Sequence, residues 1–547
     1  MGEPLTGQSP CTSSRSRGAG ASRQGPIASQ FLGAGSVEGA AELYWKERDQ
    51  TVRDEESLAF DHPCKEKATE LETRVDAILK QLRRDDVANV YARADPRRGH
   101  GGQLHPRHEG DHFLSNAALI EETEVFKVLR QMPKGAHLHI HFNACLPPDI
   151  LLGIAKGMDR MFITSDHALL PDAHGGFESY DRCEIQFSIL SREKEDEKPG
   201  DIFSPEYLAR QTMKFTRFLD EFREQRPGVD PDEWLLSKLV FEEQEAHGLL
   251  QTSLGAWEKF NGRTRMMKGL FNYEKAYRRY TAELLRDFVR DGIQYAEIRP
   301  NFMSSNQLLS DDGTRTIDND GIMKIIIEEV TNFKKDPELG ASFHGLKIIY
   351  CFDLVGEEAK GNPIREFVPQ LLEFKMDCQR EGVEIPFLFH CGETLDNGTD
   401  TDGNLVDALL LGSKRIGHGF ALPKHPHLMQ QMKEHNVCVE LCPISNEILG
   451  LTPRVNGHAM YQLLANNVHC SVSSDNGTLF RSSLSHDFYQ VMAGKADMGL
   501  WGWKQLILWS LEHACLDADE RPAIMKMWEN RWQEFLQEVD GQWAFDA

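Results

Sequence analysis

Histidine and acidic side chains follow two short apolar runs of this sequence, and such side chains can bind a metal ion or move a proton. The run Pro386-Phe-Leu-Phe-His390-Cys-Gly-Glu393 predicts a buried strand whose last residues emerge into a site. About one strand–helix unit later, the short strand that begins at Arg415 carries His418 between two glycines, which let another group approach the backbone closely. We therefore expect His390, Glu393 and His418 to converge.

The same pattern occurs at two other predicted strands. Near the first strand, His137, His139 and His141 recur at period two, which places the three imidazoles on one face. The segment 468–475 alternates apolar residues and ends on the carboxylate of Asp475, before a turn-forming Asn-Gly pair. Imidazoles and a carboxylate at the ends of four strands form a set that can bind a metal ion.

Together these motifs resemble, in order and spacing, those of the adenosine deaminase family. Within the family they are most similar to the branch called adenosine deaminase-related growth factors, or adenosine deaminase 2-like proteins. The resemblance covers roughly residues 132–537, and it rests on Met132-Pro-Lys-Gly with His139-x-His141, His390-Cys-Gly-Glu393, Arg415-Ile-Gly-His418-Gly, Cys442-Pro-Ile-Ser-Asn446 and Ser473-Ser-Asp475.

The resemblance implies zinc-dependent hydrolytic deamination of adenosine or 2'-deoxyadenosine to inosine and ammonia, with one Zn²⁺ per chain. It assigns the metal ligands as His139, His141, His390 and Asp475. It implies that Glu393 gives a proton to the purine ring, while His418 and Asp475 orient the attacking water. It places four residues against the purine nucleoside: Asn143, Trp257, Gly356 and Asn476.

Two residues depart from the family pattern, and the substrate is therefore open. The family commonly has a second Asp where this chain has Asn476, and often an acidic residue where it has Asn143. An amide can hydrogen-bond but cannot supply charge. One alternative is an amidohydrolase of the same fold that acts on another aminopurine or amino-heterocycle. A second alternative is a binding or signalling barrel without catalytic activity.

One metal ion is favoured over two. Binuclear amidohydrolases usually bridge their metals with a modified lysine on the fourth strand, but Lys347 lies at the beginning of that strand, at the wrong end of a barrel. The cytidine-type deaminase signatures H-x-E and P-C-x-x-C do not occur in the sequence.

The pattern of apolar runs predicts an α/β chain folded as a (β/α)8 TIM barrel. The deaminase barrel spans residues 129–540, and a long insertion after the first strand, at about 147–255, forms a subdomain or lid. Glu297 and Arg299 share one face of the third strand and suggest a structural ion pair. The eight expected strands are 135–141, 256–260, 293–299, 346–356, 386–393, 415–420, 437–443 and 468–475.

The segment before the barrel divides in two. Residues 1–40 are rich in Gly, Ser, Ala and Arg and predict disorder, whereas residues 41–128 predict a helical extension. The apolar stripe from Leu71 to Leu82 could pack on the barrel itself or, as related proteins suggest, form a homodimer. The sequence His108-Glu-Gly-Asp-His112 fits the zinc-protease expression, but its glycine and an upstream proline favour a polar loop.

Charge and hydropathy limit the partners. The formal net charge is −24, from 61 basic and 85 acidic residues, which argues against general binding to nucleic acid. No run approaches the ~18 apolar residues of a membrane span, and no secretory signal pattern is recognised. We expect a cytoplasmic protein, with an N-terminal transit peptide and N-myristoylation as open alternatives.

Overall fold

The computed structural model describes residues 31, 33, 35–99, 101–348 and 353–544. They fall into two units that divide between Ala59 and Phe60. In the smaller unit, α2 (Val37–Ser57) begins after Ser36, whose hydroxyl accepts a hydrogen bond from the backbone of Gly39 at 3.1 Å. The helix therefore starts a turn before the predicted boundary, and residues 1–30 of the segment predicted to be disordered lie outside the described residues.

Parallel strands form the centre of the larger unit. They make two sheets, β10-β7-β3 and β11-β12-β13-β14, in which every pairing is parallel. A parallel bridge between Ile140 and Asp475 connects the end of β3 to the residues that follow β14. The strands are β3 (Gly135–His141), β7 (Ile293–Arg299), β10 (Gly345–Ile348), β11 (Leu388–Cys391), β12 (Arg415–His418), β13 (Cys438–Leu441) and β14 (Cys470–Val472).

The predicted second strand at 256–260 is wrong, because these residues lie inside helix α13 (Ser253–Phe271). Thr252 caps the helix by accepting a hydrogen bond from the backbone of Gly255 at 3.1 Å. Strand β3 pairs directly with β7, so no strand lies between them. The other seven predicted strands are all present among the described residues.

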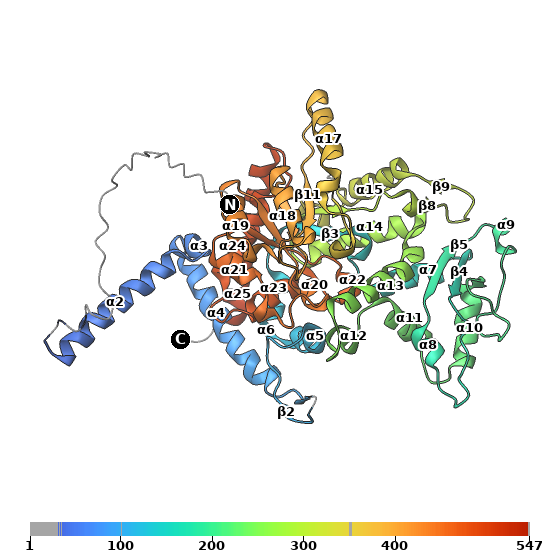
Figure 1. Cartoon of the computed structure of the whole chain (residues 1–547), viewed down its shortest axis with the longest axis horizontal. Coiled ribbons are helices and arrows are strands. Elements are labelled where there is room, and N and C mark those ends of the chain that lie inside the picture. Colours follow the sequence, from blue (N-terminus) through green and yellow to red (C-terminus); the bar gives the residue numbers. More distant parts are fainter. Residues whose placement is uncertain (1–30, 32, 34, 100, 349–352, 545–547) are drawn as a thin grey trace, which may run out of the picture. The chain divides into compact units, whose positions relative to one another are not determined.

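Helices follow the strands and cover them (Figure 1). Helix α24 packs on β3 and β14, and α14 packs on β7. The helices of this part of the chain are α14 (Glu274–Arg290), α15 (Asn319–Phe333), α17 (Val368–Glu381), α18 (Asp400–Leu410), α19 (Pro426–Glu434), α20 (Pro443–Ile448), α21 (Met460–Ala465), α22 (Gly477–Phe480), α23 (Leu484–Ala493), α24 (Leu500–Glu512) and α25 (Glu520–Trp543).

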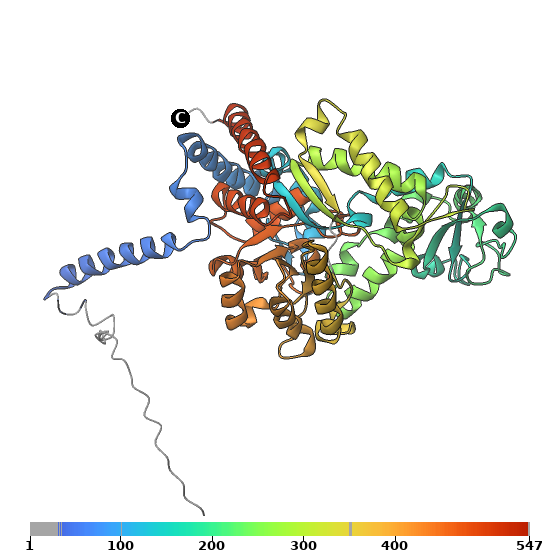
Figure 2. The ribbon, with the colours of Figure 1, turned by 90° about the horizontal axis from the view of Figure 1, so that it is seen from above.

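The segment after β3 contains a small sheet of its own, at the end of the larger unit away from α24 and α25 (Figures 1 and 2). Its strands run antiparallel in the order β5-β4-β6. Aromatic side chains fill its core, including Tyr180, Phe218, Phe222 and Trp234. The elements are α7 (Pro148–Lys156), β4 (Met161–Ser165), α8 (Glu178–Arg182), β5 (Ile185–Ile189), α9 (Arg192–Glu195), β6 (Met213–Lys214), α10 (Phe215–Gln225), α11 (Pro231–Leu239) and α12 (Glu243–His247).

The helices before β3 pack within the chain. Helix α4 begins with a capping box between Thr69 and Glu72, and its apolar stripe is buried against α6, α24 and α25. This is the first of the two interpretations of the stripe. Residues 108–112 form a loop, as predicted. The elements are α3 (His62–Glu66), α4 (Glu70–Asp86), the π-helical turn η1 (Val87–Tyr91), β1 (Arg97–Arg98), β2 (Leu104–His105), α5 (Phe113–Glu122) and α6 (Glu124–Gln131).

No helix in the part of the chain that the structure describes is long and apolar enough to cross a membrane.

Candidate active site

Four side chains meet at the carboxyl ends of the parallel strands. His139 lies on β3, His390 on β11 and His418 at the end of β12, while Asp475 follows β14. One potential ligand atom from each lies within 4.8 Å of those of the other three, and all four residues are buried. Parallel strands present their carboxyl ends at one edge, so residues distant in sequence converge there. The group can bind a metal ion.

His141, the remaining predicted ligand, borders this group. Its Nε2 atom lies 3.1 Å from Oδ1 of Asp475. Its ring centroid lies 5.4 Å from that of His139 and 5.3 Å from that of His390. His137, by contrast, takes no part, because its Nε2 accepts a hydrogen bond from the backbone of Ser474 at 3.0 Å.

His418 and Asp475 each hold a backbone conformation that residues other than glycine rarely adopt. His418 has φ 61° and Asp475 has φ 57°, both in the left-handed region. Such conformations cost roughly 1–3 kcal/mol each and persist where surrounding contacts fix them, often at functional sites. The backbone therefore turns at His418, the last residue of β12, and at Asp475, which follows β14, and both side chains lie in the site.

A carboxylate orients each of two histidines. Both carboxylate oxygens of Asp353 lie 2.8 Å from Nδ1 of His390, and Oδ1 also accepts the His390 backbone N–H at 2.9 Å. The Nδ1 atom of His139 lies 2.7 Å from the carboxylate of Glu440 and 2.6 Å from the Arg299 guanidinium. A carboxylate that accepts the Nδ1 proton leaves the Nε2 lone pair for the site, as in metal-binding histidines.

The arrangement around His139 fits a metal ion. Its Nε2 atom is buried and has no hydrogen-bond partner among the described residues. The nearest acidic atom is Oδ1 of Asp475, at 3.4 Å. A buried nitrogen without a partner is costly unless something else satisfies it, and imidazole and carboxylate are ligands that Zn²⁺ accepts.

A buried network of charges supports this side of the site. Arg415 donates to Glu440 at 2.6 Å and to Glu297, while Arg299 donates to Glu440 at 2.7 Å. The predicted pairing of Glu297 with Arg299 is therefore wrong, because each finds its partner on another strand. Burial alone would raise the pKa of Glu440, but the two guanidinium groups hold it well below its usual range.

Glu393 has the properties of a buried acid. Burial, together with the nearby charges of Asp475 and Glu358, raises the pKa of its carboxyl well above the usual range. Its backbone N–H donates to Glu358 at 2.8 Å, and Oε1 lies 3.2 Å from Nδ1 of His418. A carboxyl whose pKa is raised in this way holds its proton more tightly and can act as a general acid.

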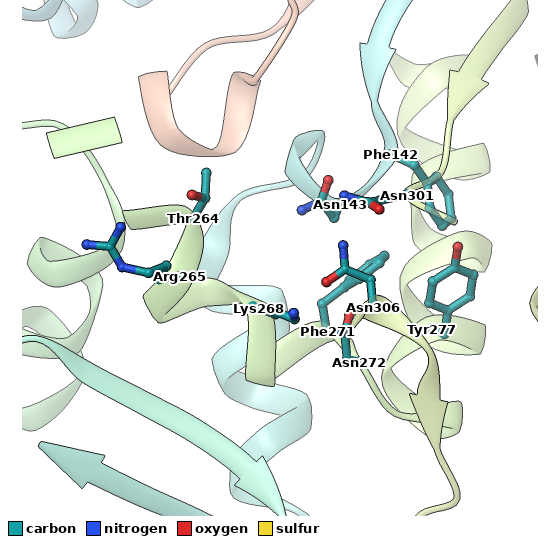
Figure 3. A pocket seen from close by; sticks show the side chains of 10 residues that line it. All are labelled: Phe142, Asn143, Thr264, Arg265, Lys268, Phe271, Asn272, Tyr277, Asn301 and Asn306. Carbon is teal, nitrogen blue, oxygen red and sulfur yellow. The ribbon is translucent and has the colours of Figure 1, made fainter. Parts of the chain in front are cut away.

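The predicted substrate residues occupy different surroundings. Asn143 lines a cavity of about 200 Å³ and faces Asn301 across it (Figure 3). Trp257 does not line this cavity, since it lies buried in α13 with its ring edge-on to Phe260 at 5.2 Å. The cavity is lined by Phe142, Asn143, Thr264, Arg265, Lys268, Phe271, Asn272, Tyr277, Asn301 and Asn306.

Gly356 and Asn476, the other two predicted substrate residues, lie elsewhere along the chain. Gly356 has φ 148°, which favours glycine, but a Cβ atom added to it would meet nothing within 4 Å. Any crowding at this position would therefore come from a bound ligand. Asn476 uses its side-chain amide to donate to Oδ1 of Asp475 at 2.9 Å. It therefore contacts a predicted metal ligand in addition to any contact with a substrate.

The sequence contains signals for the orienting carboxylates, although these residues lie outside the motifs that predict the site. Asp353 ends the apolar run of the fourth strand, and Glu440 is the one acidic residue within the apolar run 437–443. A charge inside a buried strand requires a partner. Neither signal names that partner, however, because His390 and His139 lie on other strands.

Fold and site together define a protein of the α/β class with a potential metal site of histidine and aspartate. The sequence profile of the adenosine deaminase family matches residues 240–530, which is more than half of the chain. The chain belongs to the adenosine deaminase family, and its site is that of a hydrolytic deaminase.

Two relatives with adenosine deaminase in their names match most of the chain. An adenosine deaminase of Phlebotomus duboscqi is 31% identical over 464 residues, covering 79% of this chain and 82% of the relative. Adenosine deaminase 2 of Homo sapiens is 29% identical over 463 residues, covering 78% and 83%. Among solved structures, the N6-methyl-AMP deaminase of Arabidopsis thaliana aligns over 75% of this chain and 99% of its own, with 14% identity and a TM-score of 0.46.

Proposed function

We propose that the protein hydrolyses adenosine or 2'-deoxyadenosine to inosine and ammonia, using one Zn²⁺ per chain held by His139, His141, His390 and Asp475. The observation that carries this proposal is the buried Nε2 atom of His139, which lacks a hydrogen-bond partner among the described residues and lies beside Asp475 and the other imidazoles. The names of the relatives support adenosine as the substrate.

The protein's own residues have distinct tasks in this reaction. Bound Zn²⁺ would supply Lewis-acid activation of water near neutral pH. Glu393 gives its proton to the purine ring nitrogen as the ring is attacked, a contribution of roughly 10²–10⁴-fold. Asp475 accepts first a hydrogen bond and then the proton from the attacking water, and that proton leaves with the ammonia. His418, at the end of β12, orients the water.

We also infer that the two parallel sheets belong to one closed barrel. The bridge from Ile140 to Asp475 joins them on one side. On the other side, the His390 backbone N–H on β11 donates to Asp353, which follows β10. A barrel places the carboxyl ends of all its strands around one site. Among the described residues, seven parallel strands enter this barrel rather than the eight that the sequence predicts.

A second candidate is deamination of another aminopurine or amino-heterocycle. Asn143 and Asn476 favour it, since both present amides where the resemblance to the family implies carboxylates. The non-catalytic alternative receives no support, because Glu393, His418 and the potential metal ligands all occupy the site.

Ammonia release and metal analysis test the proposal together. Adenosine, 2'-deoxyadenosine, adenine and substituted purines form the substrate panel. We expect about one tightly held zinc per chain, and we expect His139→Ala to lose metal and activity together. Full activity after demonstrated removal of the metal would contradict the mechanism, and turnover of a different heterocycle alone would establish the second candidate.

A second group of potential ligands makes one control necessary. His469, Glu512 and His513 also bring ligand atoms within 4.8 Å of one another. Metal content is therefore compared between wild type and His513→Gln, which leaves the strand-end site intact. If that variant lost the single bound zinc, the assignment of the metal to His139 and its neighbours would be wrong.

The homodimer through the N-terminal helices and the cytoplasmic location stay predictions. The mass of the full chain in solution, compared with that of a chain lacking residues 31–59, tests the dimer. Fractionation of cells tests the location.

A further inference from the structure

Two buried polar side chains link the ring of His418 to a backbone amide. Asn446 lies on the short helix α20 directly after β13, and His458 precedes α21. Asn446 is 0% exposed and His458 is 3% exposed, so water cannot replace either. The chain of contacts runs from the Met460 backbone to His458, from His458 to Asn446, and from Asn446 to His418.

The direction of each hydrogen bond in this series follows from the bond between the Met460 backbone and His458. The Met460 backbone N–H can only donate, and it lies 2.9 Å from Nδ1 of His458. That nitrogen must offer its lone pair, so the His458 proton sits on Nε2. Nε2 lies 3.0 Å from Oδ1 of Asn446 and donates to it.

The orientation of the Asn446 amide is fixed in turn. With Oδ1 accepting from His458, the NH₂ group faces His418, where Nδ2 lies 3.1 Å from Nδ1. An NH₂ group can only donate, so Nδ1 of His418 must carry a lone pair. A neutral imidazole with a lone pair on Nδ1 carries its proton on Nε2.

We propose that Asn446 and His458 are positioning residues that hold His418 in the tautomer protonated at Nε2. The proposal deepens the proposed function, and it rests on that function only for the role of His418 in the reaction. In this state His418 donates a hydrogen bond from Nε2 and cannot take a proton at that atom. It therefore orients the attacking water as a donor and is not the general base.

The second neighbour of His418 is compatible with this state. Oε1 of Glu393 lies 3.2 Å from the same Nδ1 atom. Two lone pairs would repel at this distance, and a carboxyl that carries its proton weakens this repulsion. The same arrangement that fixes His418 thus favours Glu393 as an acid, the form in which it can give a proton to a substrate.

Packing keeps the linking side chains in place. The ring of Phe420 meets His458 edge-on at 5.2 Å. The Asn446 carbonyl accepts the Leu451 backbone N–H at 2.9 Å, and its own N–H donates to Cys442 at 3.0 Å. Neither side chain touches the predicted metal ligands in these contacts, so their role would be exerted through His418.

Replacing Asn446 with Asp tests the proposal. A carboxylate only accepts, so Asn446→Asp should move the His418 proton to Nδ1 and leave a lone pair on Nε2. A histidine held in the wrong tautomer has cost up to about 10⁴-fold in kcat in a catalytic triad. We expect kcat to fall by at least ~10²-fold while KM and metal content change little. The matched control is Asn116→Asp, at a buried asparagine bonded to Arg107 and His108, for which kcat should stay unchanged.

Two variants of His458 test the same linkage without changing Asn446. In His458→Gln, the amide can accept from Met460 and donate to Asn446, so kcat should stay within ~3-fold of wild type. In His458→Leu both bonds are lost, and kcat should fall by ~10-fold or more. Equal kcat values for the two variants would overturn the proposal, including in the case where Asn446→Asp does not fold.

A spectroscopic measurement is independent of activity. Nitrogen NMR of the purified chain with ¹⁵N-labelled histidine distinguishes protonated from unprotonated ring nitrogens, and the His418 signals are assigned by their loss in His418→Gln. We expect an unprotonated Nδ1 and a protonated Nε2. A protonated Nδ1 in the wild type would refute the proposal. If the protein proved inactive on every purine, this measurement would still decide the tautomer, so the two failures are distinguishable.

Discussion

Removing the charge of Asp353 should weaken the metal site without disturbing the fold. Asp353 contacts His390 three times, through both oxygens at 2.8 Å from Nδ1 and through the backbone bond at 2.9 Å. The variant Asp353→Asn keeps one oxygen that can accept the ring N–H. It loses the negative charge that orients His390 and makes its Nε2 a stronger ligand.

The size of the effect follows from these contacts. A hydrogen bond to a charged group contributes about 1.5–3 kcal/mol, and one between neutral groups about 0.5–1.5 kcal/mol. The difference of roughly 1–1.5 kcal/mol corresponds to about tenfold in affinity. Loss of an orienting partner costs 10–100-fold in other metal sites, a range that includes this value. We therefore expect Asp353→Asn to bind Zn²⁺ about tenfold more weakly.

Competition with a chelator measures the apparent dissociation constant of the ion. The matched control is Asp86→Asn, since Asp86 is a buried carboxylate that accepts two backbone N–H groups, from Glu124 and Val125, in the N-terminal helices. Its metal affinity should equal that of the wild type. If Asp353→Asn folded normally and bound Zn²⁺ within twofold of the wild type, the orienting role of Asp353 would be refuted.

Three further predictions address the acid, the substrate contact and the pH dependence of stability. Glu393→Gln should keep metal and fold while kcat falls by at least ~10²-fold, and loss of zinc instead would make Glu393 a ligand. Asn476→Asp should raise kcat/KM for adenosine by roughly tenfold if adenosine is the substrate, because a charge-assisted hydrogen bond is about twice as strong as a neutral one. A lower kcat/KM for adenosine, with no other substrate favoured, would contradict this prediction. Burial raises the pKa of Glu447 to about 8, so the folded state binds a proton that the unfolded state releases above about 4.5. The free energy of unfolding should therefore fall between these pH values in the wild type by roughly 1.4 kcal/mol per pH unit relative to Glu447→Gln, as urea unfolding at pH 5.5 and 7.5 would measure.

The sequence predicted the strands that carry the site because their patterns are local. Histidine at period two and the abrupt end of an apolar run both depend only on neighbouring residues. For residues 256–260 the same reasoning predicted a strand where the structure has a helix, because a short apolar run fits a strand and a buried helix equally well. Thr252, which caps the helix, was the local signal that could have decided between them.

The orienting residues could not be predicted in this way, because their partners are distant. Asp353 precedes its partner His390 by 37 residues, and Glu440 lies 301 residues from His139. Periodicity states which face of a strand a side chain occupies, but not which side chain of another strand it will meet. The motif ending at Asn446 was recognised, yet its function depends on His458, which lies outside that motif.

Glu440 belongs both to the candidate site and to the buried network of charges, so a change at this residue affects both. One of its oxygens contacts His139 and Arg299, and the other accepts from Arg415, which also binds Glu297. Breaking a buried ion pair by removing one partner typically costs about 3–5 kcal/mol, because the remaining charge stays buried without compensation. Replacing Glu440 would take one partner from each of two buried guanidinium groups, those of Arg299 and Arg415, and it would free the ring of His139 at the same time. A loss of metal in a Glu440 variant would therefore not by itself identify an orienting role. Asp353 makes its short contacts with His390 and lies 3.6 Å from the Arg299 guanidinium, so removing its charge disturbs the network less.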